Sequence, residues 1–590
     1  MKWRLAVPWL VLPVAAAAQL TPEHQLALTS LRSGEKERLE KALGPLDEQP
    51  FYRAAFDVDP EARTVNGTVV ISYFAKERPL QHVYLRVTPN ADRPQAVKLQ
   101  HATVNGTPTL LEQPEPTLYR VKLDPVALPG TGATIELRVQ AKVPQAPQNS
   151  DSMEADPGLL HAHKAEYGAF LAAPEVMSLN GLLPGVVPLK ADGTPFAGPA
   201  GMGDLASYEP AHYLVSIEVP RTHEVVCAGN ALGVVPRPDG RVRYSFGLSA
   251  ARDFPIFVTR GYEKSTQEVD GVVVESHYLA SDSNAGRRVG SYAASALAEL
   301  QKRFGPYPWQ TFRVVEARLI GGAGGMEFPG LVSVSTGLYR GAANPLAALG
   351  LGGSMAQLGP LKDMLQGLDQ LMETTLEFTV AHEVAHQWFA MMVGSDPIGE
   401  PYADEPLTQH AALLYLEWKH GKRAAEAMRD AQLKMAFQFF RATGGHDGTC
   451  ERATSDFETT GEYAALIYGK CPLLFDAVRK QLGDSTYLKA LRGYADENRW
   501  KWVSADTLFR ALGPKKVEKL RKRWWQEKKG DEDLGKSEVA EMLQGMQGAQ
   551  GGAGAGPGAK PGAVDLTQQL SQEQLKQLEE LMRILNGGEP

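Results

Sequence analysis

The sequence predicts a multidomain α+β protein in which an N-terminal antiparallel β-sandwich is followed by a mostly helical domain. Between about residues 51 and 259, short runs rich in Val, Ile, Leu and Tyr alternate apolar and polar residues with a period of two. From about residue 260 to 528, longer segments with helical periodicity replace these runs. This change of period places a domain boundary near residue 260.

The composition is that of a globular protein of several domains. The chain has 590 residues, 43% of them hydrophobic and 22% charged, a length that corresponds to roughly two to four domains. Its net charge of -8 is spread along the chain, without the basic stripe that nucleic-acid-binding proteins carry. We therefore expect no nucleic-acid partner.

Residues 1–18 have the layout of a secretory signal peptide. Lys2 and Arg4 form a basic start, an apolar run extends to Val14, and the small residues Ala15 to Ala18 offer a cleavage site. The apolar run is shorter than the roughly 20 residues that a transmembrane helix needs. We expect export to the periplasm, the cell envelope or the medium, with no integral membrane span after cleavage.

Residues 19–50 are predicted to form a leader helix packed on the next domain. In "SGEKERLEKALGPL", Ser33 is the candidate N-cap and Glu35 lies in the first turn, where the helix dipole favours an acid. The sandwich is then predicted over residues 51–259, with turns at the Asn-Gly pairs that begin at Asn66 and Asn105. Its strands include the segments 64–75, 81–89, 118–126, 133–144, 211–220 and 241–250.

The second domain is predicted over residues 260–530. One helix covers residues 284–305 and ends at Gly305, a strand covers residues 312–319, and a further helix covers residues 373–394. Residues 341–372 form an insertion with Gly-rich stretches. Both a packed extra helix and a mobile cap over a cleft are compatible with this insertion.

Residues 531–590 are predicted to leave the folded body. Residues 547–563 are a Gly/Ala/Pro run that behaves as a flexible linker. The segment after the linker predicts an amphipathic helix, with Ser571 and Gln574 in a capping box. This helix is a candidate for self-association or partner contact, although a marginal tail helix fits the pattern equally well.

The chain contains three cysteines, Cys227, Cys450 and Cys471. So few cysteines in an exported chain argue against a fold that is built on disulfides. One bridge can form, and the sequence leaves its pairing open.

The segment "AHEVAHQWFA" contains the pattern from which function is argued. His382 and His386 are four residues apart in a predicted helix, so both imidazoles face the same side and can bind one metal ion. Glu383 projects near the same face, where it can act on a water molecule. A catalytic zinc site uses three protein ligands, and Glu405, near the start of the next predicted helix, is the candidate for the third.

These residues resemble the gluzincin metallopeptidases and, more narrowly, the M1 aminopeptidase family. His382-Glu383-x-x-His386 is followed by Glu405 after eighteen intervening residues. Upstream, "GGMEF" resembles the Gly-x-Met-Glu-Asn strand of the family, and downstream "YGK" at Tyr468 resembles its Tyr-x-Lys-Gly motif. The resemblance extends over about residues 51 to 528.

The resemblance implies a saddle-like β-sandwich followed by a thermolysin-like, mostly helical catalytic domain that binds one Zn2+ per chain. It implies that the zinc ligands are His382, His386 and Glu405. It further implies that Glu383 is the general base and that Tyr468 donates a hydrogen bond to the oxyanion that develops in the transition state.

The resemblance also implies where a peptide substrate binds. The implied substrate-binding residues are Gly324, Gly325, Met326 and Glu327. Glu327 would meet the N-terminal ammonium of the peptide, and the glycines permit close backbone approach. The sequence departs from the family pattern at Phe328, Pro406 and Cys471. No segment supplies the second acidic anchor of the family, for which Glu175 is the best candidate we find.

The sequence thus predicts an exported zinc-dependent metallopeptidase that acts on peptides, as an aminopeptidase. One alternative is a related hydrolase with altered specificity, either an endopeptidase or an enzyme for a non-peptide substrate. A second alternative is a non-catalytic binding protein of the cell envelope. The complete set of candidate catalytic residues argues against a binding protein, because binding alone requires none of them.

Overall fold

The computed structural model of the protein describes residues 20–147, 167–196, 198, 202–203, 208–343 and 359–535. The predicted signal peptide, the predicted linker and terminal helix, and residues 344–358 of the insertion lie outside these residues. No helix in the described part of the chain is both long enough and apolar enough to cross a membrane.

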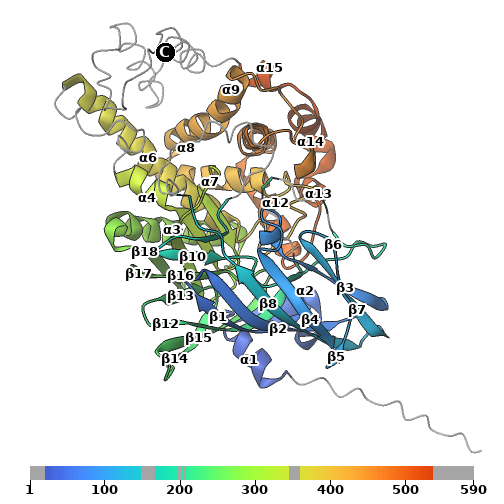
Figure 1. Cartoon of the computed structure of the whole chain (residues 1–590). Helices are drawn as coiled ribbons and strands as arrows, with labels where there is room; N and C mark the ends of the chain where they lie inside the picture. Colours follow the sequence, from blue (N-terminus) through green and yellow to red (C-terminus); the bar gives the residue numbers. More distant parts are fainter. Residues whose placement is uncertain are drawn as a thin grey trace, which may run out of the picture.

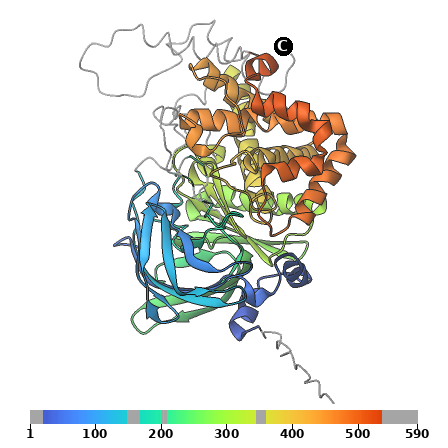
Figure 2. The same ribbon diagram turned by 90° about the vertical axis from the view of Figure 1, so that its right-hand side faces the viewer.

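The N-terminal part of the chain is built from β-sheets, which form one end of the molecule in both views (Figures 1 and 2). The largest sheet has eight strands in the order β14-β15-β12-β1-β2-β8-β4-β5. Two sheets of four strands have the orders β13-β16-β10-β9 and β11-β3-β7-β6. Pairing is antiparallel except between β1 and β12, which run parallel.

The strands of these sheets have the following bounds: β1 (Phe51–Asp59), β2 (Thr64–Phe74), β3 (Leu80–Arg86), β4 (Val97–Val104), β5 (Thr107–Pro108), β6 (Leu111–Glu115), β7 (Leu118–Ala127), β8 (Gly132–Lys142), β9 (Phe170–Ala172), β10 (Val176–Leu179), β11 (Gly185–Val186), β12 (Ala211–Pro220), β13 (Glu224–Cys227), β14 (Asn230–Pro236), β15 (Arg241–Ala251) and β16 (Ile256–Thr259). Burial alternates along the strands, as β8 illustrates with Ile135, Leu137 and Val139 buried between more exposed neighbours. One face of the strand therefore packs into the core.

The two Asn-Gly pairs have different roles. Asn105 and Gly106 have φ values of 50° and 80° and form the turn between β4 and β5, as predicted. Asn66 and Gly67 instead lie inside β2, so the prediction of a turn there is wrong. A Cβ atom at Gly67 would lie 2.4 Å from a ring carbon of Phe56, so the glycine is required for close packing between strands.

The leader segment contains two α-helices, α1 (Pro22–Leu28) and α2 (Glu35–Leu43), followed by a 3-10 turn, η1 (Leu46–Glu48). The N-cap of α2 was predicted at Ser33 and lies one residue later, at Gly34. Gly34 precedes α2 with a φ of 79°, a left-handed conformation that glycine adopts without strain.

The second part of the chain begins with a mixed sheet of order β17-β18-β19-β21-β20. Its strands are β17 (Tyr262–Val269), β18 (Val272–Leu279), β19 (Thr311–Ala317), β20 (Gly325–Phe328) and β21 (Leu331–Ser335). We had expected helices from about residue 261, so the β17-β18 hairpin corrects that expectation. Asp270 and Gly271, with φ values of 48° and 75°, form the turn of this hairpin.

Helices cover this sheet and form the other end of the molecule (Figures 1 and 2). They are α3 (Ser283–Phe304), α4 (Thr336–Ala343), α6 (Gly359–Ala385), α7 (Glu405–His420), α8 (Lys422–Met428), α9 (Met435–Ala442), α10 (Thr460–Tyr463), α11 (Leu473–Leu482), α12 (Asp484–Glu497), α13 (Ala505–Leu512), α14 (Pro514–Arg521) and α15 (Gly530–Leu534). The described residues also include the π-helical segments η6 (Arg429–Lys434), η8 (Ala464–Lys470) and η9 (Lys522–Gln526). The order of a β-sheet domain followed by a mostly helical domain is confirmed.

Helix α6 differs from the predicted helix at both of its ends. It ends at Ala385, nine residues before the predicted end at residue 394, and it begins at Gly359, inside the predicted insertion. The second half of the insertion is therefore the first half of the helix that contains His382.

Candidate active site

His382 lies in the last turn of α6 and His386 directly follows the helix, with the two rings nearly perpendicular to each other. The backbone N–H of His386 donates to the carbonyl of His382 at 3.2 Å, and their Nε2 atoms are 3.1 Å apart. The Nδ1–H of His386 donates to the carbonyl of Phe389 at 3.1 Å. This bond fixes the tautomer of His386 and leaves the lone pair of its Nε2 atom facing His382.

Glu405 reaches the histidines from the first turn of α7. Asp404 is the N-cap of this helix and accepts a hydrogen bond from the backbone N–H of Glu405 at 2.8 Å. The Oε2 atom of Glu405 is 3.3 Å from Nε2 of His382 and 3.4 Å from Nε2 of His386. All three predicted ligands are buried and present one atom each to a common point.

This arrangement fits a tetrahedral zinc ion. Two ligands bound at about 2.0–2.1 Å with a tetrahedral angle are about 3.3 Å apart, and the three observed separations are 3.1, 3.3 and 3.4 Å. Within the described residues, the buried Oε2 atom of Glu405 accepts no hydrogen bond. A buried carboxylate oxygen without a hydrogen bond is costly unless a cation faces it.

The carboxylate of Glu405 is held in its charged form. Burial alone would raise its pKa, but the nearby His386 and His382 outweigh burial and keep the pKa well below its usual range. A divalent ion would displace the protons from these imidazoles, and two neutral imidazoles with one carboxylate would leave the ion a net positive charge, as Lewis-acid chemistry requires.

Glu383 lies beside the three ligands and is not one of them. A Cβ atom at Gly325 would lie only 2.3 Å from its Oε1 atom, so the carboxylate packs directly against the backbone of β20. Its Oε2 atom is buried and has no hydrogen-bond partner among the described residues. Burial and the neighbouring Glu327 raise the pKa of the Glu383 carboxyl well above its usual value. Such a desolvated carboxylate is a ready proton acceptor.

Among the described strands, the predicted substrate strand β20 lies at the edge of its sheet and pairs with β21 alone. Gly325, Met326 and Glu327 lie on β20, and Gly324 immediately precedes it. Burial raises the pKa of the Glu327 carboxyl to about 7. The charge of His386 lowers this pKa, and the charge of Glu405 raises it.

Gln387 joins this strand to the histidine helix. Its Nε2 donates to the carbonyl of Phe328 at 2.9 Å, and its Oε1 accepts from the N–H of Gly330 at 2.9 Å. Sequence reasoning had assigned no role to this residue, although it directly follows His386.

Tyr468 lies on η8 and reaches the site from a third direction. Its hydroxyl donates to Oε1 of Glu405 at 2.7 Å, and its backbone carbonyl accepts from Nε2 of Gln409 at 3.3 Å. Burial and the charge of Glu405 raise the pKa of the phenol well above its usual value. The hydroxyl therefore keeps its proton and can serve as a hydrogen-bond donor.

A second acid near Glu327 comes from Asp253, which the sequence analysis missed. Asp253 follows β15, and with Glu327, Ser395 and Asp404 it lines a small cavity. Burial raises its pKa to about 7. Glu175, the earlier candidate, instead forms an ion pair with Arg318. No motif marks Asp253, because it approaches the site only through the packing of the two domains.

Comparison with known proteins identifies the catalytic part of the chain. Residues 366–525 match the Peptidase family M1 domain, and this segment contains the three candidate zinc ligands. A search of curated proteins found no match.

The fold is similar to solved structures of M1 zinc metallopeptidases. A glutamate-to-alanine mutant of the M1 zinc metallopeptidase from Deinococcus radiodurans superposes with a TM-score of 0.54 at 18% identity, covering 82% of this chain and 95% of that chain. The same mutant bound to a Tyr-Ser-Ala substrate gives 0.53 at 18% identity, covering 81% and 94%. A two-domain M1 zinc metallopeptidase mutant bound to L-tryptophan gives 0.52 at 17% identity, covering 81% and 95%. The two-domain M1 fold is thereby confirmed.

Proposed function

We propose that this protein is an exported zinc-dependent aminopeptidase that releases residues from the N-termini of peptides. The observation that carries the proposal is the placement of Glu327, a partly buried acid on an edge strand beside the zinc ligands. An edge strand can pair with an extended peptide. A carboxylate near its end can then meet the free ammonium of the first residue. The neighbouring structures that contain Tyr-Ser-Ala and L-tryptophan support a ligand with a free amino group.

The side chains of the site can be assigned roles in hydrolysis. When bound, zinc lowers the pKa of water and polarises the scissile carbonyl. Glu383 accepts a proton from the attacking water and passes it to the leaving amine. Tyr468 donates its phenolic hydrogen bond to the oxyanion, exchanging its present partner, Oε1 of Glu405, for the substrate. The Oε2 atom that faces the histidines remains available to the metal.

Peptides that differ only at the N-terminus test this proposal. N-acetylation should lower kcat/KM at least tenfold, because a charge-assisted contact with the ammonium contributes about 1.5–3 kcal/mol. Glu327→Ala should lose most of this preference and retain zinc, while Glu327→Asp, which keeps the charge, should preserve part of it. Equal cleavage of free and acetylated peptides by the wild type would reject the proposal that the protein is an aminopeptidase.

The same experiment tests the second candidate, a hydrolase with altered specificity. The pairing of Glu175 with Arg318 and the presence of Phe328 in place of the family asparagine favour this candidate over a strict aminopeptidase. An endopeptidase would cleave acetylated peptides internally, and an enzyme for a non-peptide substrate would cleave neither set. Turnover of any peptide would exclude a purely binding function.

Export is supported by two independent features. Residues 1–18 have the pattern of a signal peptide, and Cys450 and Cys471 form a disulfide, a bond that persists mainly in oxidising compartments. In a bacterial host, the full chain should accumulate outside the cytoplasm, and a variant without residues 1–18 should remain inside. Retention of the full chain in the cytoplasm would reject export.

A further inference from the structure

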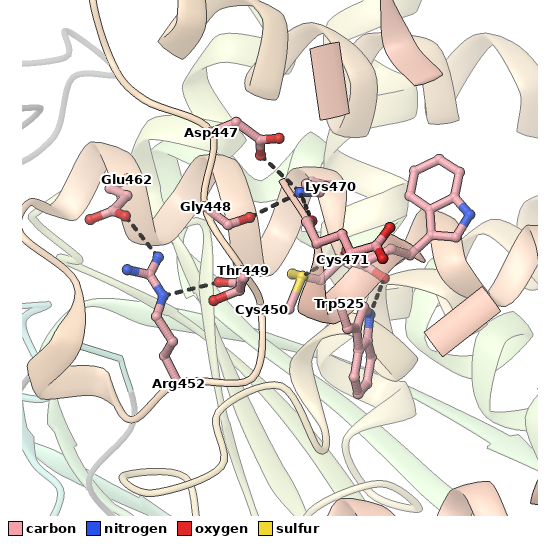
Figure 3. Close-up of a disulfide and its surroundings, with 11 residues drawn as sticks. Asp447, Gly448, Thr449, Cys450, Arg452, Glu462, Lys470, Cys471 and Trp525 are labelled. Carbon is pink, nitrogen blue, oxygen red and sulfur yellow. Dashed lines mark hydrogen bonds and ion pairs between the residues drawn. A yellow bond between two sulfur atoms is a disulfide. The ribbon is translucent and has the colours of Figure 1, made fainter. Parts of the chain in front are cut away.

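A disulfide closes the turn that contains Tyr468. Cys471 directly follows η8 and is bonded to Cys450, and both residues are fully buried. Figure 3 shows that Cys450 lies on a loop beside this turn. The N–H of Cys471 donates to the carbonyl of Leu466 at 2.8 Å, across the wide π-turn. Such π-turns are uncommon and need support from their surroundings.

Lys470, the residue between Gly469 and the disulfide, makes a second attachment. Its side chain is fully buried, and its Nζ donates to Oδ1 of Asp447 at 2.8 Å, to the carbonyl of Gly448 at 2.9 Å and to the carbonyl of Glu527 at 3.1 Å (Figure 3). All three ammonium hydrogens therefore have acceptors. A buried charge with complete hydrogen bonding resists displacement.

Trp525 also links the two cysteines, through hydrogen bonds to their backbone groups. Its Nε1 donates to the carbonyl of Cys471 at 2.9 Å, and its carbonyl accepts from the N–H of Cys450 at 2.7 Å. We call Asp447, Cys450, Lys470, Cys471 and Trp525 the disulfide cluster.

The other end of the turn is tied to the same segment. Arg452, two residues after Cys450, donates to Oε1 of Glu462 at 2.7 Å and to the carbonyl of Thr449 at 3.0 Å (Figure 3). Glu462 lies in α10, which leads directly into η8. Residues 447–452 therefore bind the chain on both sides of Tyr468.

We propose that the disulfide cluster positions Tyr468 for catalysis, with Cys450, Cys471 and Lys470 as positioning residues. Tyr468 is three residues from Cys471, and its hydroxyl must lie within hydrogen-bonding distance of the zinc site. The backbone at Gly469 is tightly packed, because a Cβ atom there would lie 3.0 Å from the carbonyl oxygen of Leu433. Loss of the disulfide should therefore move the phenol while leaving the zinc ligands His382, His386 and Glu405 in place. This inference rests on the proposed peptidase function.

The first test is a kinetic cycle with Cys450→Ala/Cys471→Ala and Tyr468→Phe. The cysteine variant should lose roughly tenfold in kcat with KM and zinc content unchanged, a part of the about 10²–10³-fold that removal of an oxyanion donor costs. In the Tyr468→Phe background the same cysteine changes should have no further effect on kcat. Equal losses in both backgrounds would overturn the proposal, since they would show that the disulfide supports the fold in general.

Two variants with related changes complete the test. Cys227→Ala, which alters the buried free cysteine of β13, should leave kcat unchanged. If the double cysteine variant does not fold, Asp447→Asn should show the same kinetic pattern more weakly, because it removes the charge opposite Lys470 and retains the disulfide. An unchanged kcat in Asp447→Asn would then count against the proposal.

Amide hydrogen exchange gives a measurement that does not require turnover. Amides in residues 464–471 should exchange faster in the double cysteine variant, or in Asp447→Asn if that variant replaces it, while those around His382 should be unchanged. Unchanged exchange in residues 464–471 would overturn the proposal even if the wild type hydrolyses no peptide. A lack of turnover in the wild type would reject the peptidase function separately, whatever the exchange result.

Discussion

At the scale of single residues, the acid–base state of each site group follows from burial and immediate neighbours. The pKa of Glu405 is lowered because the charge of His386 and the contacts with both imidazoles outweigh its burial, whereas the pKa of Glu383 is raised by its burial and by the neighbouring acid Glu327. Two buried glutamates at one site thus suit two tasks, metal binding and proton transfer.

The first prediction separates these tasks. Glu405→Ala should lose most of the roughly one zinc per chain, because two histidines alone make an incomplete site. Glu383→Gln is the matched control and should keep zinc while kcat falls by about 10²–10⁴. Metal analysis and peptide kinetics on both variants check this. Full zinc occupancy in Glu405→Ala would show that the third ligand is assigned wrongly, and near-normal kcat in Glu383→Gln would exclude it as the base.

The second prediction concerns pH and His212, far from the zinc site in sequence. Its ring bonds the hydroxyl of Ser249 through Nδ1 and the carbonyl of Leu46 through Nε2 at 3.2 Å. Because a carbonyl only accepts, Nε2 donates and the neutral ring uses Nδ1 as the acceptor. Burial lowers the pKa of His212 to about 3, below the unfolded value of 6.5.

The sign follows from proton linkage. Between pH 6.5 and 3 the unfolded chain binds the proton and the folded chain does not, so this contribution to stability falls as pH decreases. The slope from this residue is at most about 1.4 kcal/mol per pH unit. In thermal denaturation between pH 7 and 4, His212→Gln should therefore lose less stability than the wild type. Parallel curves for the two proteins would refute the assignment.

At the scale of elements, local sequence predicted strands and helices well wherever local signals agree with packing. The helix over residues 284–305 and the strand over residues 312–319 correspond to α3 and β19 within a residue or two. The turn predicted at Asn66-Gly67 is wrong because the glycine is needed there for close packing against Phe56 on the neighbouring strand. The β17-β18 hairpin was missed although Asp270-Gly271 is a standard hairpin turn signal.

The candidate site was predictable to the extent that it is local. Helical spacing alone places His382 and His386 together. The position of Glu405 at the start of the next predicted helix made it the candidate third ligand, and the family resemblance supplied Glu327 and Tyr468. The cysteine pairing and the approach of Asp253 depend on tertiary contacts between distant segments, which no sequence spacing reveals.

The third prediction concerns the contact between β20 and α6. A Cβ atom at Gly325 would lie 2.3 Å from Oε1 of Glu383, whereas one at Gly324 would meet a Thr379 methyl at 3.3 Å. Gly325→Ala should therefore push the carboxylate or the strand aside, and strain of about 1–3 kcal/mol should lower kcat/KM by roughly tenfold or more. Gly324→Ala is the neighbouring control, with a smaller effect. Zinc analysis should be normal in both, and equal kinetics for the two variants would refute the argument.

At the scale of the whole molecule, the leader segment joins the two domains. The N–H of Arg32 donates to the carbonyl of Pro308 at 2.9 Å, and its guanidinium donates to Gln301 at 2.7 Å. On the other side, α1 packs against β12 and β15 of the large sheet. Removing this segment would thus expose surfaces of both domains.

The most distant of these contacts in sequence is an ion pair between α2 and the chain after α12. Nη2 of Arg499 lies 2.6 Å from Oε2 of Glu35, and their side chains are 8% and 3% exposed. Arg499 also donates to the carbonyl of Pro306 at 2.9 Å. Glu35 has a second partner in Arg38 at 2.7 Å, but Arg38 is half exposed and its contribution is correspondingly small.

The fourth prediction tests whether this pair holds the leader in place. Glu35→Ala leaves the guanidinium buried without its carboxylate, which costs about 3–5 kcal/mol in comparable pairs. Glu35→Ala/Arg499→Met also removes the unpaired guanidinium. This double variant should recover much of the lost stability, because the unpaired buried charge causes most of the destabilisation. Calorimetry should thus show the lower Tm for the single variant, with peptide kinetics unchanged in whatever fraction remains folded. A double variant less stable than Glu35→Ala would mean that the two side chains stabilise the docked leader independently, through their packing and their other hydrogen bonds.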